Sequence, residues 1–470
     1  MNKKKGVFTC LLAISLLVTE VPMLADAKAY TESNVTADMC TSDYWINLMG
    51  EAANNVLMSK EAIGRYNQSA LTAADCNMND IENMDSSYDA TALKAALAAD
   101  VMDQMPKKDT YVNSVLTDAG AYYGAVSACV QATGWEGTLT PKYALAVEQT
   151  QIKAIPTVDY IGYSETDSDD EIIVSSLRVN EPFVIKQCAV VGNAAFYYGY
   201  SNHVTGWVLA DDLAICDTKK EWTDMWKVDM NSTNFLVVTS DEFCLSESHY
   251  APATSGLKLT MGTVLKQVPE NDVPRNIAMR GTWNNYVVYV PTRDTTGRMV
   301  RQITLVSQGK DVNEGYLPLT SANIMEIAFT SLGNTYGWGG MLDSVDCSAY
   351  VRNIYKCFGF EMPRNTSWQR KVPGTAVDIT GMDDATKTAV LSTCIPGTPL
   401  YLPGHTMIYL GTVDGKCYVI SAMGSASESV GSLDVKVENA VAVTSLNVRR
   451  RNGNSWLASI DCVVLPWNIQ

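Results

Sequence analysis

The sequence is poor in residues that bind metal ions. Only three histidines (His203, His249 and His405) occur in 470 residues, and none of the twelve cysteines belongs to a CxxC pair. Structural zinc sites usually draw their ligands from such pairs. We therefore expect no metal site and no cofactor.

Long apolar runs and an excess of cations are missing as well. Beyond the first residues, no segment has the eighteen or so consecutive apolar residues of a membrane span. Lys and Arg together number 35, Asp and Glu number 51, and the net charge is −16. An acidic chain is repelled by nucleic acid and by anionic wall polymers. We expect no nucleic-acid partner and no stable membrane insertion, and we read the acidic balance mainly as an aid to solubility.

The N-terminus has the pattern of a secretory signal. Lys3, Lys4 and Lys5 precede an apolar run over residues 7–18, and Ala25-Asp26-Ala27 offers the small-x-small pattern read by signal peptidase. We predict a signal peptide at residues 1–27 and a secreted protein, extracellular or in the cell envelope. Eleven cysteines remain after cleavage, a number compatible with five disulfides and one thiol or with reduced thiols throughout.

The mature chain changes pattern along its length. Trp45, Leu48 and Met49 recur at helical spacing, and residues 90–102 are rich in Ala and Leu, which predicts a helical domain over 28–140. Short β-branched and aromatic runs separated by Gly, Pro, Asn and Asp then follow. They predict two small β-barrels at 141–218 and 230–318, and a mixed helix and strand pattern returns at 319–470.

Cys347 is the candidate nucleophile. Cys347, Val351, Ile354 and Phe358 are spaced by four, three and four residues, which predicts a helix with Cys347 in its first turn, facing the domain, and with Gly359 as its stop. A helix start lowers the pKa of a cysteine, and a neighbouring imidazolium lowers it further. The alternative is a buried, space-filling cysteine.

His405 is the candidate base. It follows the turn Pro403-Gly404, opens an apolar strand over 406–410, and is the only histidine after residue 249. A lone histidine is more often structural than catalytic. If Cys347 has an imidazole base within its own domain, however, that base must be His405.

Several motifs together resemble a known family. They are Tyr336-Gly337-Trp338-Gly339-Gly340, Asp346-Cys347-Ser348, Pro363-Arg364-Asn365-Thr366-Ser367-Trp368-Gln369, and His405 followed by Met407-Ile408-Tyr409-Leu410-Gly411. This set resembles the NlpC/P60 family of bacterial cell-wall cysteine peptidases. The upstream regions are similar to multi-domain members with an N-terminal stabilising domain and two bacterial SH3 domains. The resemblance implies an α+β fold: a papain-like catalytic domain after a helical domain and two SH3-like barrels.

The resemblance also implies an activity. A secreted peptidoglycan hydrolase would cut stem peptides or muropeptides, commonly between γ-D-glutamate and the following diamino acid, and we expect a monomer. Cys347 would attack the carbonyl while His405 moves the proton. Tyr336 would help stabilise the oxyanion, or it could simply pack on Trp338. Asp346 and Ser348 would help bind the stem peptide and its free N-terminal L-alanine, although Asp346 could equally cap the helix.

One position departs from the family pattern. Members usually carry a histidine, or another polar residue such as Asn or Gln, on the strand after the catalytic histidine, and the run Tyr418–Ala422 places Ser421 there. A serine hydroxyl can orient the ring of His405, with weaker control of its tautomer.

The turn of this hairpin decides where Ser421 points. A two-residue loop at Asp414-Gly415 would put Ser421 opposite Ile408, facing away from His405. A three-residue loop over 413–415 would put it opposite Met407, on the His405 face. We predict the three-residue loop.

Other functions remain open at this point. The missing third histidine allows a non-catalytic wall-binding protein with a degenerate site. The thiol also allows an amidase that cuts another wall amide bond, or an acyltransferase. The two barrels could bind the wall, or they could pack on the catalytic domain and narrow its cleft.

Overall fold

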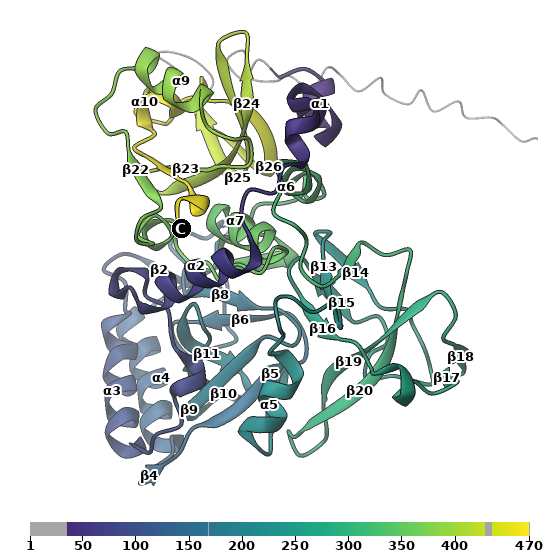
Figure 1. Cartoon of the computed structure of the whole chain (residues 1–470). Helices are drawn as coiled ribbons and strands as arrows, with labels where there is room; N and C mark the ends of the chain where they lie inside the picture. The colour runs from purple at the N-terminus through teal and green to yellow at the C-terminus, as the bar shows by residue number, and fades with distance from the viewer. Residues whose placement is uncertain (1–34, 168, 428–434, 470) are drawn as a thin grey trace, which may run out of the picture.

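The structure, a computed structural model, describes residues 35–167, 169–427 and 435–469. The predicted signal peptide at 1–27 lies outside the described residues. Figure 1 shows a C-terminal lobe in green and yellow above a blue lobe built around a large sheet, with a teal strand-rich unit beside them. Helix α1, from the N-terminal region, lies against the C-terminal lobe.

The N-terminal region forms four main helices and a few short strands. The helices are α1 (Ser42–Met49), α2 (Lys60–Thr72), α3 (Ala90–Asp103) and α4 (Ala119–Thr133), and the short strands, together with one in the following segment, are β1 (Tyr88–Asp89), β2 (Thr110–Val112), β3 (Val115–Thr117), β4 (Thr138–Leu139) and β7 (Ile161–Gly162). Each of the four helices starts at a side-chain cap, which satisfies a free amide of its first turn: Thr41, Ser59, Asp89 and Asp118.

These helices pack on two different neighbours. Trp45 of α1 lies 5.5 Å from the ring of Tyr418, and Tyr66 of α2 lies 4.9 Å from Phe360, both in the C-terminal lobe. Helices α3 and α4 instead share a buried core with the large sheet, which includes Trp207. The segment predicted as one helical domain is therefore divided between two lobes.

The first strand-rich unit is an open seven-stranded sheet, in the order β12-β5-β9-β10-β11-β6-β8. Its strands are β5 (Lys142–Ala146), β6 (Thr150–Lys153), β8 (Ile173–Leu177), β9 (Pro182–Val191), β10 (Ala194–Tyr200), β11 (Thr205–Leu209) and β12 (Leu213–Cys216). The predicted closed barrel is wrong here, because β8 and β12 are the edges of the sheet. A loop of the C-terminal lobe covers the β8 edge, since the Trp338 indole N–H donates to the carbonyl of Ile173 at 2.8 Å.

The second strand-rich unit is also open. After α5 (Lys219–Trp226) it contains β13 (Phe235–Val238), β14 (Glu242–Cys244), β15 (Lys258–Thr260), β16 (Val264–Lys266), β17 (Asn276–Ile277), β18 (Arg280–Gly281), β19 (Asn285–Arg293), β20 (Met299–Ser307) and β21 (Val312–Glu314). One sheet has the order β16-β13-β21, and the other strands form three separate antiparallel pairs. The long β19–β20 hairpin extends outward (Figure 1) and pairs as a separate two-stranded sheet, so these strands do not form a closed barrel.

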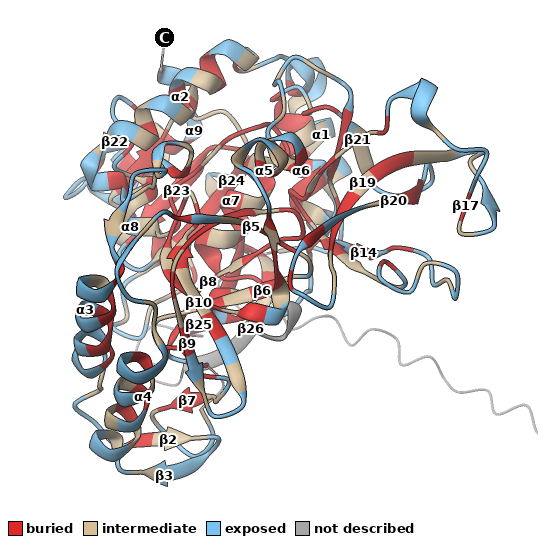
Figure 2. Ribbon diagram, turned by 90° about the horizontal axis from the view of Figure 1, so that it is seen from below, coloured by how far each residue is buried: buried red, intermediate tan, exposed pale blue. Residues whose placement is uncertain are grey.

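The C-terminal lobe combines helices with a six-stranded sheet in the order β22-β27-β23-β24-β25-β26. The elements are α6 (Ser321–Phe329), α7 (Cys347–Lys356), α8 (Thr366–Gln369), β22 (Ala376–Asp378), α9 (Asp384–Ser392), β23 (Pro399–Leu402), β24 (His405–Val413), β25 (Lys416–Ser427), β26 (Val435–Ser445), α10 (Trp456–Ser459) and β27 (Cys462–Val464). Helix α7 packs on β24. Figure 2 shows α7 and the central strands in the buried interior, whereas α3 and α4 expose one side to solvent.

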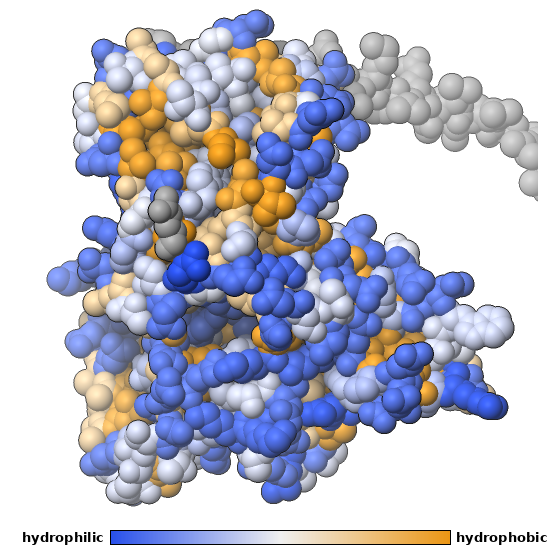
Figure 3. Space-filling view, in the orientation of Figure 1, coloured by the Kyte–Doolittle hydropathy of each residue, from blue (hydrophilic) through white to orange (hydrophobic). Residues whose placement is uncertain are grey.

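The cysteines form no disulfides among the described residues. The eleven cysteines from Cys40 to Cys462 are all free in the structure. Within the described residues, no helix combines the length and apolar character needed to cross a bilayer. Figure 3 shows hydrophilic residues over most of the two strand-rich units and a gathering of apolar residues on the C-terminal lobe.

Candidate active site

Cys347 occupies the first turn of α7. The preceding residue, Asp346, has an extended backbone, and its carboxylate accepts the amide hydrogen of Ala349 at 2.9 Å, so the helix begins at Cys347. The Cys347 side chain is turned inward and is 7% exposed. Val351 and Ile354 follow on the same buried stripe, as the spacing predicts, and Gly359, with φ of +93°, comes just after the helix end.

The sulfur of Cys347 lies against the start of β24. The backbone amides of Thr406 and Ser348 donate hydrogen bonds to this sulfur, and both bonds act to lower its pKa. His405, the residue before Thr406, opens β24 and pairs with Leu402 across the turn. The fold therefore brings the thiol and the imidazole to the same end of the contact between α7 and β24.

The ring of His405 is held on two sides. Its Nε2 lies 3.2 Å from the hydroxyl of Ser421, which is fully buried on β25. The indole of Trp456 packs against the ring with centroids 4.8 Å apart. Because Ser421 engages Nε2, Nδ1 is the ring nitrogen left for exchanging a proton with a thiol or a substrate.

The β24–β25 hairpin places Ser421 beside His405 through a turn that differs from the predicted one. Val413 pairs with Lys416 across a two-residue loop, so the predicted three-residue loop is wrong. Asp414 and Gly415 both have positive φ, as a primed two-residue turn requires. A bulge between Tyr409 and Gly411 then shifts the register by one residue, so that Ile408 pairs with Ile420 and Ser421 points toward His405.

The protonation of the pair differs from the prediction. Burial, followed by the charge of Asp346, raises the pKa of Cys347 to about 12 despite the helix start. Burial, together with the charge of Arg450, lowers the pKa of His405 to about 4. Both shifts favour the neutral thiol and the neutral imidazole, because desolvation outweighs the helix-terminus effect that the sequence suggested.

The Asp346 carboxylate is buried, and its contacts are all with other protein groups. It is fully buried and forms a two-point ion pair with Arg364, whose second contact is 3.1 Å long. Its oxygens also accept the amide of Gly339 at 3.1 Å and the hydroxyl of Ser348 at 3.0 Å. Asp346 and Ser348 are both buried, and their predicted contact with a stem peptide stays a prediction. Asp346 has the alternative role, that of a helix cap.

Tyr336 stands beside the thiol. Its amide donates to the carbonyl of Asn439 at 2.8 Å, which fixes the loop that leads to Cys347. Burial raises the pKa of Tyr336, and the charges of Cys347, Asp346 and Asp169 raise it further. The phenol is therefore protonated, and the electrostatic influence of Cys347 on it places Tyr336 in the neighbourhood of the thiol. Asp169 belongs to the first strand-rich unit, so that unit also reaches the site.

Sequence reasoning missed two residues of the site. Arg364 belongs to the Pro363–Gln369 motif, but the sequence analysis assigned it no role. A buried arginine needs an acidic partner, and Asp346 is the acidic residue in the motifs named above. Trp456 gave no signal, because it belongs to a short helix far along the chain. Among the described residues, no group of three or more His, Cys, Asp or Glu side chains is placed to hold a metal ion.

Comparison with known proteins identifies part of this lobe. The NlpC/P60 family profile matches residues 333–430, so the chain carries an NlpC/P60 domain there, and the predicted resemblance is confirmed for that segment. No curated protein matches the sequence. An NlpC/P60 endopeptidase from Photobacterium damselae subsp. piscicida shares the fold, with a TM-score of 0.66, 14% identity, and coverage of 91% of this chain and 97% of that one.

Two structures from Trichomonas vaginalis match more weakly. NlpC2 has a TM-score of 0.23 at 13% identity, with coverage of 67% of this chain and 99% of its own. NlpC1 has a TM-score of 0.22 at 14% identity, with coverage of 66% of this chain and 93% of its own.

Proposed function

We propose that this protein is a secreted cysteine peptidase that hydrolyses peptidoglycan stem peptides, with the bond between γ-D-glutamate and the diamino acid as its target. The observation that carries the proposal is the placement of Cys347 at the start of α7, hydrogen-bonded by the Thr406 amide next to His405. The NlpC/P60 match over 333–430 contains both residues. That family supports a peptidase acting on the cell wall.

In the first step the substrate acylates the Cys347 sulfur. The Cys347 proton moves to Nδ1 of His405 as the sulfur attacks the γ-carbonyl carbon of D-glutamate. The Tyr336 hydroxyl and the Cys347 backbone amide are the donors that we assign to the oxyanion. The C–N bond then breaks, His405 returns its proton to the leaving amine, and a thioester remains on Cys347.

Water completes the reaction. His405 takes a proton from a water molecule as its oxygen attacks the thioester carbonyl; the C–S bond then breaks, the acid leaves, and His405 returns the proton to the Cys347 sulfur. Because burial raises the pKa of the thiol and lowers that of the imidazole, we assign proton transfer and attack to one concerted step. Ser421 keeps Nε2 engaged throughout, so that Nδ1 carries the proton.

Digestion of defined muropeptides tests the proposal. The parent protein is expected to release L-Ala-γ-D-Glu and a peptide starting at the diamino acid, both identified by mass spectrometry, whereas Cys347→Ala releases neither. Release of intact stems from the glycan would instead indicate an amidase. Binding to the wall without cleavage by the parent would indicate a wall-binding protein.

A further inference from the structure

A buried chain of polar side chains joins the first strand-rich unit to the cap of α7. Asp346 is paired with Arg364, whose Nε donates to the hydroxyl of Ser175 on β8 at 3.0 Å. The same hydroxyl lies 3.0 Å from Nε2 of His203, in the connection between β10 and β11. All four side chains are at most 1% exposed.

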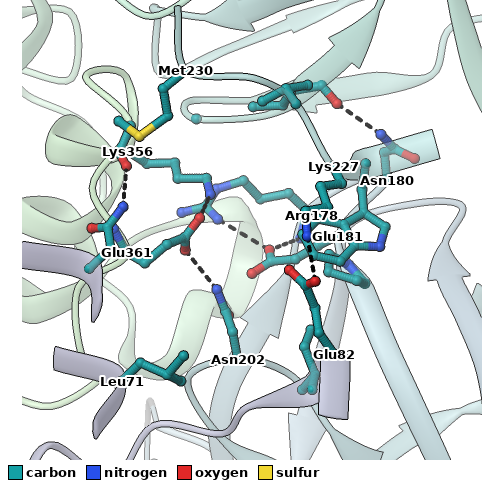
Figure 4. Close-up of a pocket in the computed structure, with 18 of the residues that line it drawn as sticks. Leu71, Glu82, Arg178, Asn180, Glu181, Asn202, Lys227, Met230, Lys356 and Glu361 are labelled. Carbon is teal, nitrogen blue, oxygen red and sulfur yellow. Dashed lines mark hydrogen bonds and ion pairs between the residues drawn. The ribbon is translucent and has the colours of Figure 1, made fainter. Parts of the chain in front are cut away.

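The chain continues to the wall of a cavity. Nδ1 of His203 lies 2.8 Å from the amide oxygen of Asn202, whose amide nitrogen donates to Glu361 at 2.6 Å. Asn202 and Glu361 line a cavity of about 360 Å³, apart from the thiol, where α2, the β8–β9 connection and the end of α7 meet. Figure 4 shows Asn202 pointing toward Glu361 across this cavity.

The hydrogen bonds run in one direction. The Arg364 N–H can only donate to Ser175, so the serine hydroxyl is free to donate its own hydrogen to Nε2 of His203. His203 then carries its proton on Nδ1 and donates it to the oxygen of Asn202. This assignment requires a neutral ring.

The charges around His203 favour that neutral ring. Burial lowers the pKa of His203 well below its usual value, and the cations facing it lower it further; they are Arg352, Arg178, Arg364 and Lys356. Glu181, 3.5 Å from Nδ1, is the anion on the other side, and it is held by Arg178. His203 therefore remains an uncharged acceptor for Ser175 near neutral pH.

We propose that Ser175 and His203 are positioning residues for the Cys347 nucleophile, although they belong to the first strand-rich unit and lie outside the segment matched by the family. The proposal rests on the function proposed above. Arg364 contacts both carboxylate oxygens of Asp346 through its terminal nitrogens, while its Nε donates to the hydroxyl of Ser175, which helps to fix the orientation of the guanidinium. Asp346 in turn sets the first turn of α7, where the sulfur sits.

Two loss variants and two controls test this role. Ser175→Ala removes the acceptor of Arg364, and His203→Leu removes the acceptor of Ser175. His203→Gln is the conservative variant, because its amide can occupy the place of Nε2. Ser321→Ala is the matched control: Ser321 is equally buried and donates to the carbonyl of Pro396 at 2.7 Å, and it is not a member of the chain of contacts to Asp346.

Steady-state kinetics should distinguish a loss of Cys347 positioning from a general loss of protein stability. Loss of one positioning hydrogen bond is expected to lower kcat about fivefold or more in Ser175→Ala and His203→Leu, with KM within about twofold of the parent. His203→Gln should retain most of the parental kcat, and Ser321→Ala should match the parent. If His203→Leu does not show the cooperative unfolding of a folded protein, its kinetics are set aside. The kcat of Ser175→Ala, the smaller change, then tests the positioning role.

A substrate-free measurement keeps the test independent of the proposed function. The rate at which iodoacetamide alkylates Cys347, followed by peptide mass spectrometry, should change about threefold or more in Ser175→Ala and remain parental in Ser321→Ala. The exposed Cys244 serves as the internal reference. If both the alkylation rate and kcat of Ser175→Ala equal those of Ser321→Ala, the positioning role is overturned. If the parent cuts no muropeptide but its alkylation rate still depends on Ser175, only the proposed function fails.

Discussion

At the scale of single residues, the site is defined by desolvation. A cysteine at a helix start next to a histidine suggests an ion pair, but here the same burial that protects the thiol keeps both partners neutral. Cys347 has a pKa of about 12 and His405 a pKa of about 4. Reactivity toward a small neutral reagent should therefore be low in the resting protein.

The pH dependence of alkylation tests this state. Iodoacetamide reacts with the thiolate, so its rate at Cys347 should be low near neutral pH and should keep rising with pH toward about 12. Peptide mass spectrometry distinguishes Cys347 from the other cysteines. A rate that is already at its plateau between about pH 4 and pH 8 would instead reveal a preformed thiolate and imidazolium pair.

Ser421 supplies the second residue-scale prediction. Ser421→Ala removes the contact with Nε2 of His405, so the ring is oriented only by Trp456. A hydrogen bond of about 1 kcal/mol corresponds to a loss of about fivefold in kcat. Ser425→Ala, an exposed serine on the same strand, is the control. Equal kcat values for the two variants would remove Ser421 from the mechanism.

At the scale of elements, the cap of α7 is the critical structure. Burial by itself would raise the pKa of Asp346, but Arg364 and the hydrogen bonds hold it below its usual value. The pair therefore adds stability at pH values above the ordinary carboxyl range, and this stability is lost as the pH falls through the lowered pKa.

Replacement of Arg364 tests the cap. Arg364→Ala leaves a buried carboxylate without its partner, which should cost about 3–5 kcal/mol in the free energy of unfolding near pH 7. Its deficit should shrink in acid, because the Asp346 pKa rises and protonation removes the buried charge. Arg370→Ala, which breaks the partly exposed pair with Asp461, should cost no more than about 1 kcal/mol. Urea unfolding of both variants makes the comparison, and equal costs would contradict the account.

The elements also show how far sequence reasoning reaches. The α7 helix was predictable because a buried stripe fixes the helical period, and Gly359 marks its end. The bulge of β24 was missed, although Gly411 inside the apolar strand is the kind of residue at which bulges form. Likewise, alternating strands predicted the two strand-rich units but not the open β8 edge of the first, which is covered by Trp338 from a distant part of the chain.

At the scale of the whole molecule, the catalytic loop depends on a neighbouring unit. Gly339 has φ of +65°, and a Cβ there would lie 2.1 Å from Cγ2 of Ile173 on β8. The loop that bears Gly339 and Trp338 thus fits against β8 only without a side chain at this point. The first strand-rich unit is therefore part of the active-site structure rather than a separate module.

A pair of substitutions tests this contact between lobes. Gly339→Ala should lower the thermal unfolding temperature and reduce kcat/KM about tenfold or more, because the added methyl group displaces the loop next to the thiol. Adding Ile173→Ala removes the clashing atoms and should restore part of kcat/KM. If the double variant shows only the sum of two losses, the clash is not the cause and the strain of positive φ alone accounts for the defect.

The central claim is that the sulfur of Cys347 becomes acylated by the stem peptide. Rapid acid quenching of the protein with L-Ala-γ-D-Glu-diamino acid substrate, followed by peptide mass spectrometry, examines it directly. We predict a transient L-Ala-γ-D-Glu thioester on the peptide that contains Cys347 and on no other cysteine. Turnover of the substrate without any adduct on Cys347, or with an adduct on a different residue, would contradict the account.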